Sequence, residues 1–355
     1  MMAAHLRHRP LDEADLEVRA DELSRTGPTI HTRLVTRVAG SVEPSPRVEV
    51  KRDGDGWKVD VEVPGAVAVP RPGLTVGTIE RVAAPTARQL DASIPTRVAV
   101  STDPEMTPLG SGPVKLSGRP GREYTPLLVT PSDGRHLLGS HAWPWNLTGL
   151  VTTSDGKAGS GVLIGDRLML TAHHMRPSAT IARGSWWMTF TPNFDSGNAP
   201  FGSSNVSDLR HYDSESDTQY IVGHDFMLCR LFEPMGQHLG FIGASTFDDD
   251  WRGMNVWSNV GYPIDVGGGQ RPAVQTGQSM EDDYEDDSGQ YIETEASLNH
   301  GNSGGPFFSW FTDGHVRLCS VVSGETSFNG DVDNVLAGGD DMINLISWGR
   351  ANWPA

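Results

Sequence analysis

The sequence predicts an all-β fold that closes with a C-terminal helix, and three patterns carry this prediction. Apolar runs of strand length flank Gly165-Asp166 and again Asp313-Gly314, as in buried β-hairpins. Arg47 to Val69 alternates around Asp53-Gly54-Asp55-Gly56, which indicates another hairpin. Asp341 to Trp348 instead places its apolar residues at helical spacing behind an acidic start, which predicts the closing helix.

The composition divides the chain into two parts. Residues 1 to about 130 contain a charged stretch with weak helical spacing, Leu11 to Leu23, and then proline and glycine at a density suited to loops and short strands. They contain no internal repeat and no catalytic cluster. We therefore expect residues 1–130 to be a small β-rich prosegment or accessory region, with a boundary near Pro131 and the functional domain at 131–355.

Charge and hydropathy limit the partners. The 355 residues carry a formal net charge of −17, which disfavours nucleic acid or an anionic membrane as a partner. No run approaches the ~18 consecutive apolar residues of a membrane-spanning helix, and Met1 to Leu23 lacks the apolar core of a signal peptide. We expect a soluble cytoplasmic protein, or a secreted one if a leader has been trimmed from the sequence. The two cysteines, Cys229 and Cys319, lie in apolar strand-like runs and are expected to be buried free thiols.

The chemistry is predicted to centre on Ser303, in Gly301-Asn302-Ser303-Gly304-Gly305. Flanking glycines allow a sharp turn in which the hydroxyl projects and nearby amides converge on one point. The N–H groups of Gly301 and Ser303 are candidates for an oxyanion hole, which stabilises the negative charge that develops on a substrate carbonyl oxygen. The alternative is a glycine-rich turn with an incidental serine.

A serine nucleophile needs a histidine base and an orienting carboxylate, and candidates for both lie upstream. The hairpin that starts at Gly159 delivers His174 at its end, and Asp225 precedes an apolar strand, where an unpaired charge would be costly. On a strand, His173 and His174 would point to opposite faces, so a surface or packing role is expected for His173. The alternative for Asp225 is a strand-capping residue.

Three motifs resemble those of chymotrypsin-like serine proteases. Leu170 to His174 is similar to their Leu-Thr-Ala-x-His, Gly301 to Pro306 to their Gly-Asp/Asn-Ser-Gly-Gly-Pro, and Asp225 to Leu231 to their aspartate and apolar strand. The resemblance implies two six-stranded antiparallel β-barrels, a triad of His174, Asp225 and Ser303, no cofactor, and a protein or peptide substrate. The chain order disfavours the α/β-hydrolases, in which the serine comes first.

Within this family, the sequence is most similar to V8-like glutamyl endopeptidases. Trp143 to Gly149, Tyr220 to Gly240 and Gly261-Tyr-Pro263 resemble elements of that group. However, glutamyl-specific enzymes place a histidine just before the strand that pairs with the substrate, and this chain has Val322 there. A preference for glutamate is therefore not expected.

Two further departures bear on redox compartment and activation. A disulfide common among secreted relatives is absent, because Gly159 or Ser160 occupies one end and Met175 the other, which favours a reducing compartment. Asn302 replaces the aspartate that a freed N-terminal amine pairs with in trypsin-type zymogens. Activation by that route is not expected.

The resemblance also implies the residues that bind substrate. The pocket for the residue before the scissile bond would be lined by Ser297, Leu298 and His300, and the substrate backbone would pair with Val322, Ser323 and Gly324. His300 could meet an acidic side chain, although a loop histidine is more often simply exposed.

One acidic run and one alternative function complete the predictions. Glu281 to Asp287 holds six acids in seven residues without the turn spacing of a calcium loop, so a solvated loop is expected and no metal site. The alternative function is a latent or inactive protease homologue that binds peptides, with the N-terminal region closing the cleft.

Overall fold

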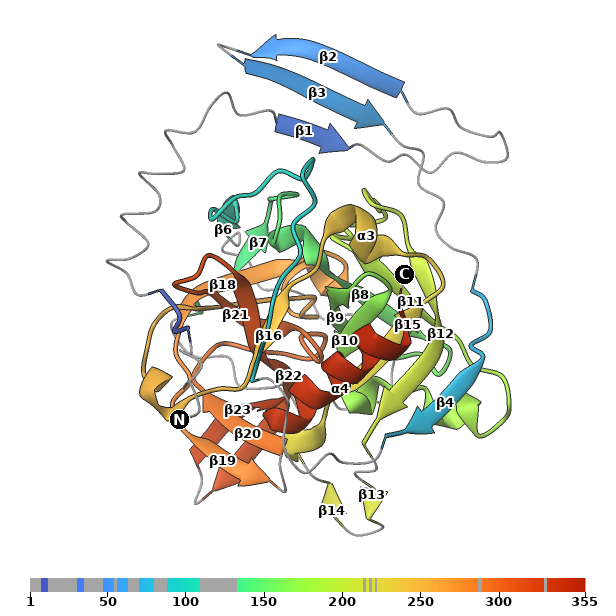
Figure 1. The fold of residues 1–355 in the computed structure, drawn as a ribbon, viewed down its shortest axis with the longest axis vertical. Coiled ribbons are helices and arrows are strands. Elements are labelled where there is room, and N and C mark those ends of the chain that lie inside the picture. The colour runs from blue at the N-terminus through green and yellow to red at the C-terminus, as the bar shows by residue number, and fades with distance from the viewer. Residues whose placement is uncertain are drawn as a thin grey trace, which may run out of the picture.

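The computed structural model of the protein describes residues 8–11, 31–34, 47–53, 56–62, 70–79, 88–108, 133–212, 215–216, 219–220, 222–286, 289–328 and 331–354. Strands dominate these residues, and two curved sheets form the body of the molecule (Figure 1). No helix among them is long and apolar enough to span a membrane. The helical stretch expected at Leu11 to Leu23 lies outside the described residues, apart from Leu11.

The first sheet closes into a six-stranded antiparallel barrel. Its strands are β8 (Thr148–Thr153), β9 (Ala158–Gly165), β10 (Leu168–Thr171), β11 (Met188–Pro192), β12 (Ser204–His211) and β15 (Met227–Leu231). They follow the order β11-β8-β9-β10-β15-β12, and β12 pairs back with β11 through Thr189↔Asn205 and Phe190↔Ser204. The hairpin predicted at Gly165-Asp166 is confirmed, since β9 pairs with β10 across that turn.

The second sheet curls in the same way. Its strands are β17 (Trp257–Gly261), β18 (Ala273–Gln278), β19 (Asp283–Asp286), β20 (Gly289–Thr294), β21 (Pro306–Trp310), β22 (Val316–Phe328) and β23 (Asp331–Gly338). The order runs β20-β23-β22-β21-β17-β18, and the chain after β18 returns to β20, where the Glu281 N–H donates to the Glu293 carbonyl over 3.0 Å. The hairpin predicted at Asp313-Gly314 joins β21 to β22 and is confirmed.

Part of the acidic run is a strand, where a loop was expected. Asp283 to Asp286 forms β19, which pairs with β20 in the register Asp283↔Ile292. Asp283 accepts hydrogen bonds from Arg252 and from the side-chain amide of Gln290. Strand pairing and these hydrogen bonds hold this part of the run in the sheet.

Short elements connect the strands. They are β7 (His136–Leu138), η1 (Trp145–Leu147), η2 (His173–Met175), α2 (Ser178–Ile181), β13 (Glu215–Ser216), β14 (Gln219–Tyr220), η3 (Val222–His224), α3 (Met235–Leu239), β16 (Gly243–Ser245), η4 (Asp249–Trp251) and η5 (Gly267–Gly269). The chain then ends in α4 (Asp340–Asn352), which buries Met342, Ile343, Leu345 and Ile346 as their spacing predicts. The predicted fold, two barrels with a closing helix, is confirmed.

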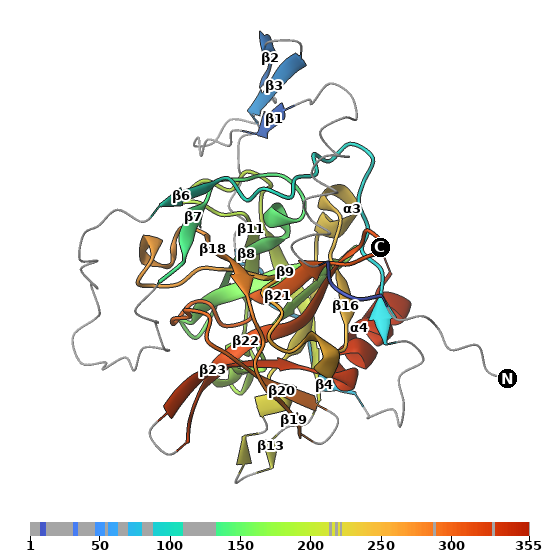
Figure 2. The ribbon, with the colours of Figure 1, turned by 90° about the vertical axis from the view of Figure 1, so that its left-hand side faces the viewer.

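The N-terminal part adds strands to both sheets. We call residues 70–79 and 88–108 the strap (cyan in Figures 1 and 2); it contains β4 (Thr75–Thr78), β5 (Gln89–Leu90) and β6 (Met106–Pro108). These strands pair with β12, β16 and β7 respectively. The strap therefore runs from the first barrel across the connection between the barrels to the edge of the second sheet.

A separate three-stranded sheet precedes the strap. It consists of β1 (His31–Leu34), β2 (Arg47–Asp53) and β3 (Gly56–Glu62), in the order β1-β3-β2. The hairpin predicted there is confirmed by the pairing Asp53↔Gly56. The side chains of these three strands lie outside what the structure describes.

The apolar core forms two clusters. The larger one fills the first barrel, extends under α4 and continues into the second sheet at Val260 and Leu318, whereas the smaller one packs Trp251, Trp257, Phe307 and Phe311 together. Both thiols are free and fully buried, Cys229 in the larger cluster and Cys319 in the smaller, as predicted. Burial raises the pKa of the Cys229 thiol well above its usual range, so this group is unreactive.

Candidate active site

His174 lies on the 3-10 turn η2, directly after β10. Its ring Nδ1 is 2.7 Å from Oδ2 of Asp225, and its backbone N–H donates to Oδ1 of the same carboxylate over 2.8 Å. About one third of the imidazole is exposed (34%), whereas the Asp225 side chain is fully buried (0%). Both the ring and the backbone of His174 are therefore oriented by one carboxylate, and the ring retains access to solvent.

Asp225 is buried with its charge satisfied. It follows η3 and leads into β15, so the strand core holds it, as the sequence suggested. Besides the two bonds from His174, its Oδ2 accepts one from the Ser323 hydroxyl over 2.6 Å. Three hydrogen bonds to one carboxylate remove most of the cost of burying the charge.

The loop that carries Ser303 is held between the two barrels. The Ser303 carbonyl accepts the N–H of Ser160 on β9 over 2.8 Å, and the Gly304 N–H donates to the Val322 carbonyl on β22 over 2.8 Å. A Cβ at Gly304 would lie 2.2 Å from Oγ1 of Thr171, so only glycine fits against the strand that leads to His174. Ser303 is therefore fixed next to the end of β10, and its neighbouring strand carries the serine that binds Asp225.

Two N–H groups in the loop of Ser303 have no acceptor among the described residues. The His300 carbonyl accepts the N–H of Ile264 over 2.8 Å, and the Asn302 carbonyl accepts the N–H of Gly305 over 2.7 Å. In a trans peptide the N–H points opposite to the carbonyl. The N–H groups of Gly301 and Ser303 therefore point away from the Ile264 and Gly305 N–H groups that those carbonyls bind.

Gly301 has a positive φ and lies too close to the Tyr262 backbone for a side chain. Its φ is 99°, in the region that favours glycine, and a Cβ there would lie 2.1 Å from the Tyr262 carbonyl oxygen. Any side chain at this position would displace the backbone of the loop.

Ser160 supports the loop, and the sequence gave no reason to single it out for this role. Its hydroxyl donates to the Gly301 carbonyl over 2.6 Å and accepts the Tyr262 N–H over 3.0 Å. Its carbonyl accepts the Thr171 hydroxyl over 2.7 Å. The only signal was its place between two glycines, which pack against methionine side chains.

Asn302 works inside the loop as a neutral residue. Its amide donates to Oδ1 of Asn259 over 3.1 Å, and its own Oδ1 accepts the Asn299 N–H over 3.2 Å. The side chain is buried and bonded at both ends. This arrangement needs no charged partner, which agrees with the expectation drawn from the asparagine.

His173 is a packed residue rather than a second base. The structure corrects the strand assumed for the two histidines, since β10 ends at Thr171 and His173 lies in the 3-10 turn. Its ring packs 4.4 Å from that of His211, between ring centroids. Burial, with a smaller contribution from His211, lowers the pKa of His173 to about 4, so the ring is neutral at neutral pH.

The residues expected to bind substrate fall into two groups. Ser297, Leu298 and Val322 are almost completely buried, and the last two contribute to the smaller apolar cluster. His300 is half-buried, and Gly324 has open space where a Cβ would lie. Their roles in substrate binding stay predictions.

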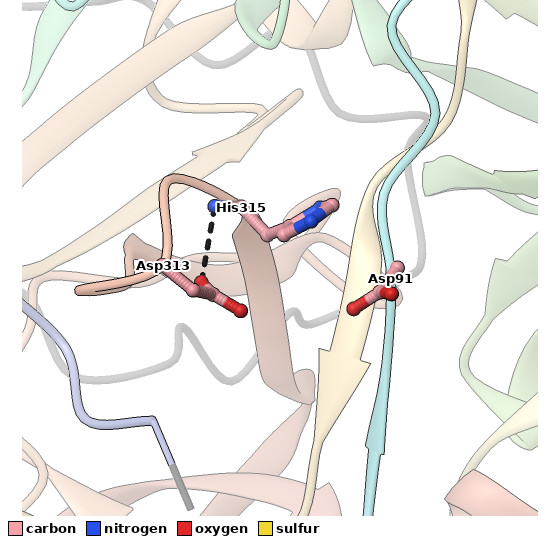
Figure 3. Close-up of side chains that lie close together, drawn as sticks. All are labelled: Asp91, Asp313 and His315. Carbon is pink, nitrogen blue, oxygen red and sulfur yellow. Dashed lines mark hydrogen bonds between the residues drawn. The ribbon is translucent and has the colours of Figure 1, made fainter.

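Asp91, Asp313 and His315 form the one group in the described part of the chain whose side-chain atoms could together hold a metal ion (Figure 3). The buried Arg317 guanidinium already binds both carboxylates, at 2.6 Å from Asp91 and 2.7 Å from Asp313. Burial opposes ionisation of Asp313, but the hydrogen bonds from Arg317 outweigh it and lower its pKa to about 2. The cluster is an ion-pair network that joins the strap to β22.

A closed antiparallel barrel, a second curled sheet, a terminal helix and a site between the two define the chymotrypsin-like class of serine proteases. Residues 159–316 match the family model of the trypsin-like peptidase domain. The resemblance to chymotrypsin-like serine proteases is therefore confirmed. This match supports a hydrolase of the peptidase class that acts on proteins or peptides.

Three solved protease structures have folds similar to that of this chain. A Glu endopeptidase in complex with MPD is 18% identical, with 63% of this chain and 100% of that chain covered and a TM-score of 0.51. The protease Anisep from Arthrobacter nicotinovorans is 18% identical over 57% of this chain and 93% of that one, with a TM-score of 0.43. The thermostable serine protease AL20 from an extremophilic microorganism is 19% identical over 59% and 98%, also at 0.43. No curated protein matches this chain.

Proposed function

We propose that the protein is a serine endopeptidase in which His174, Asp225 and Ser303 act as a catalytic triad. The observation that carries the proposal is the bonded set at the junction of the barrels, in which Asp225 holds both the ring and the backbone of His174. The Ser303 loop supports it, because this loop is clamped between β9 and β22 beside that set. The alternatives of an incidental serine and a capping aspartate fit these contacts less well.

The chemistry follows from the hydrogen bonds. With Nδ1–H donated to Asp225, the Nε2 atom of His174 is left to accept the Ser303 proton as the hydroxyl attacks a peptide carbonyl. The N–H groups of Gly301 and Ser303 would stabilise the resulting oxyanion, and each such donor contributes roughly 3 to 4 kcal/mol. His174 then protonates the leaving amine, and water hydrolyses the acyl-enzyme.

The test is peptide hydrolysis by three variants. We expect Ser303→Ala and His174→Ala to lower kcat about 10⁴-fold or more, because the members of a triad act as one unit. His173→Ala is the matched control, since its ring packs against that of His211. It should retain kcat below its melting temperature. Equal losses in the two histidine variants would contradict the assignment of His174.

The specificity is expected to differ from that of glutamyl endopeptidases. Val322 occupies the position where those enzymes place a histidine, and its side chain lies in the apolar core. A peptide library should therefore show no dominant preference for glutamate before the cleaved bond. Strong cleavage after glutamate would instead point to His300, which is half-buried in the loop before Ser303.

The alternative, a latent or inactive homologue, gains little support. Within the described residues, the strap pairs with β12, β16 and β7, and none of its hydrogen bonds reaches the Ser303 loop or Ser323. The hydrogen bonds of the strap therefore give no support to latency.

A further inference from the structure

Lys157 lies directly before β9 and reaches across to the turn that carries His174. Its Nζ donates to the carbonyl of His174 over 2.9 Å and to that of Arg176 over 2.6 Å. It also forms an ion pair with Asp155, whose Oδ2 is 3.4 Å from Nζ. The ammonium thus binds two carbonyls at the C-terminal end of η2, where the carbonyls of a helical turn lack partners within the helix. The Arg176 carbonyl also accepts the Ser178 N–H over 2.8 Å.

The backbone of Lys157 is held by Thr153. Its N–H donates to Oγ1 of Thr153 over 3.0 Å, and its carbonyl accepts the Thr153 N–H over 3.1 Å. The same Thr153 hydroxyl donates to Asp155 over 2.6 Å. The ammonium is therefore presented from a rigid turn of the first barrel.

His174 is consequently held on both sides of its Cα. Its N–H is bonded to Asp225, and its C=O is bonded to Lys157. On the same side of the turn, Met175 packs over Gly159, where a Cβ would lie 2.8 Å from its sulfur. Both described cysteines are buried free thiols, so the turn is held by this contact and the ammonium and not by a disulfide.

We propose that Lys157 is a positioning residue, which fixes where the His174 ring lies by binding the backbone carbonyl of His174. The inference rests on the proposed function, because it matters only if His174 transfers a proton. Without the ammonium, two carbonyls at the end of η2 lose a charged donor and the turn is free to shift. A displacement of the base by about 1 Å can lower the rate of the chemical step about 100-fold.

The test separates positioning from binding and from folding. Lys157→Met keeps the apolar stem and removes both hydrogen bonds, and we expect kcat to fall about 10- to 100-fold with little change in KM. Lys157→Arg should recover part of kcat, because its guanidinium can still donate to the carbonyls. Asp155→Asn is the matched control. It removes the ion pair but leaves both carbonyl bonds, so kcat should stay near that of the unchanged protein.

Several outcomes overturn the inference. Unchanged kcat in Lys157→Met, with His174→Ala inactive, refutes the positioning role and leaves the proposed function intact. A rise in KM at constant kcat, or an equal loss in Asp155→Asn, also refutes it. If Lys157→Met does not fold, Lys157→Gln replaces it, because its amide can still donate to one carbonyl. Activity that survives His174→Ala refutes the proposed function itself.

Discussion

Ser160 joins the strand before His174 to the loop that carries Ser303, and we expect it to affect catalysis without touching substrate. Ser160→Ala leaves the buried Gly301 carbonyl and the Tyr262 N–H without their shared partner. Such a loss typically costs about 1 to 3 kcal/mol of unfolding free energy. Because Gly301 supplies a proposed oxyanion donor, kcat should also fall about tenfold. Urea unfolding and steady-state kinetics measure the two effects.

Ser309→Ala is the matched control for Ser160→Ala. Ser309 is also buried, and its hydroxyl donates to the Val256 carbonyl over 2.9 Å, away from the Ser303 loop. It should lose stability but keep kcat. Equal kcat losses in the two variants would show that Ser160 acts only through stability.

His173 should make stability depend on pH. Its pKa in the folded protein is about 4, against a reference value of 6.5, so the unfolded chain binds the proton first as the pH falls. The stabilising contribution of neutral His173 is therefore complete above about pH 6.5 and is lost as the pH falls towards 4. His173→Phe should unfold in urea with a flatter dependence between these values. An unchanged slope would show that other groups cause it.

Some residues at the site lie in short sequence motifs, whereas others are defined only by partners far away in the chain. His174, Asp225 and Ser303 could be proposed from the sequence because each lies in a short motif that resembles those of a known family. Ser160 and Lys157 could not, since their partners at Gly301 and Arg176 are chosen by the packing of strands and turns that the sequence does not place. For Asn302, the sequence showed only that it lacks the charge of an aspartate, and its hydrogen bonds to Asn259 and Asn299 were not predicted.

Among the elements, the strap is the main addition to the predicted fold. Its strands β4 and β5 pair with the first barrel and with the connection between the barrels, and Asp91 binds the buried Arg317. Deleting residues 1–130 would leave the Arg317 charge without one of its partners and expose β12. We expect a lower melting temperature and lower activity, measured by calorimetry and peptide hydrolysis.

A smaller deletion gives the control for the strap. Removing residues 1–69 leaves the strap pairings in place and should cost less stability than the full deletion. A full deletion that is as stable as the whole chain and more active would instead favour latency.

Hairpins were predictable where the turn signal is short, as at Asp53-Gly54-Asp55-Gly56 and Asp313-Gly314. Within the acidic run, Asp283 to Asp286 was predicted wrongly, because charge density suggested a loop while pairing with β20 made a strand. The strap could not be predicted, since its strands are two to four residues long and acquire their partners only from the folded body.

At the scale of the whole molecule, two barrels bring together residues that are far apart in the chain. His174 and Asp225 come from the first barrel, whereas the Ser303 loop and Ser323 come from the second sheet. The site therefore depends on how the two bodies pack, with α4 and the strap as additional contacts. The compartment and the boundary near Pro131 stay predictions.

The most direct test is labelling of the intact chain with a fluorophosphonate, followed by mass spectrometry of the labelled peptide. An activated serine that faces a histidine base reacts with this reagent, whereas an ordinary surface serine does not. We expect one label per chain, on Ser303, and none after His174→Ala. Label elsewhere, or no label on a folded chain that still cleaves peptides, would contradict the account.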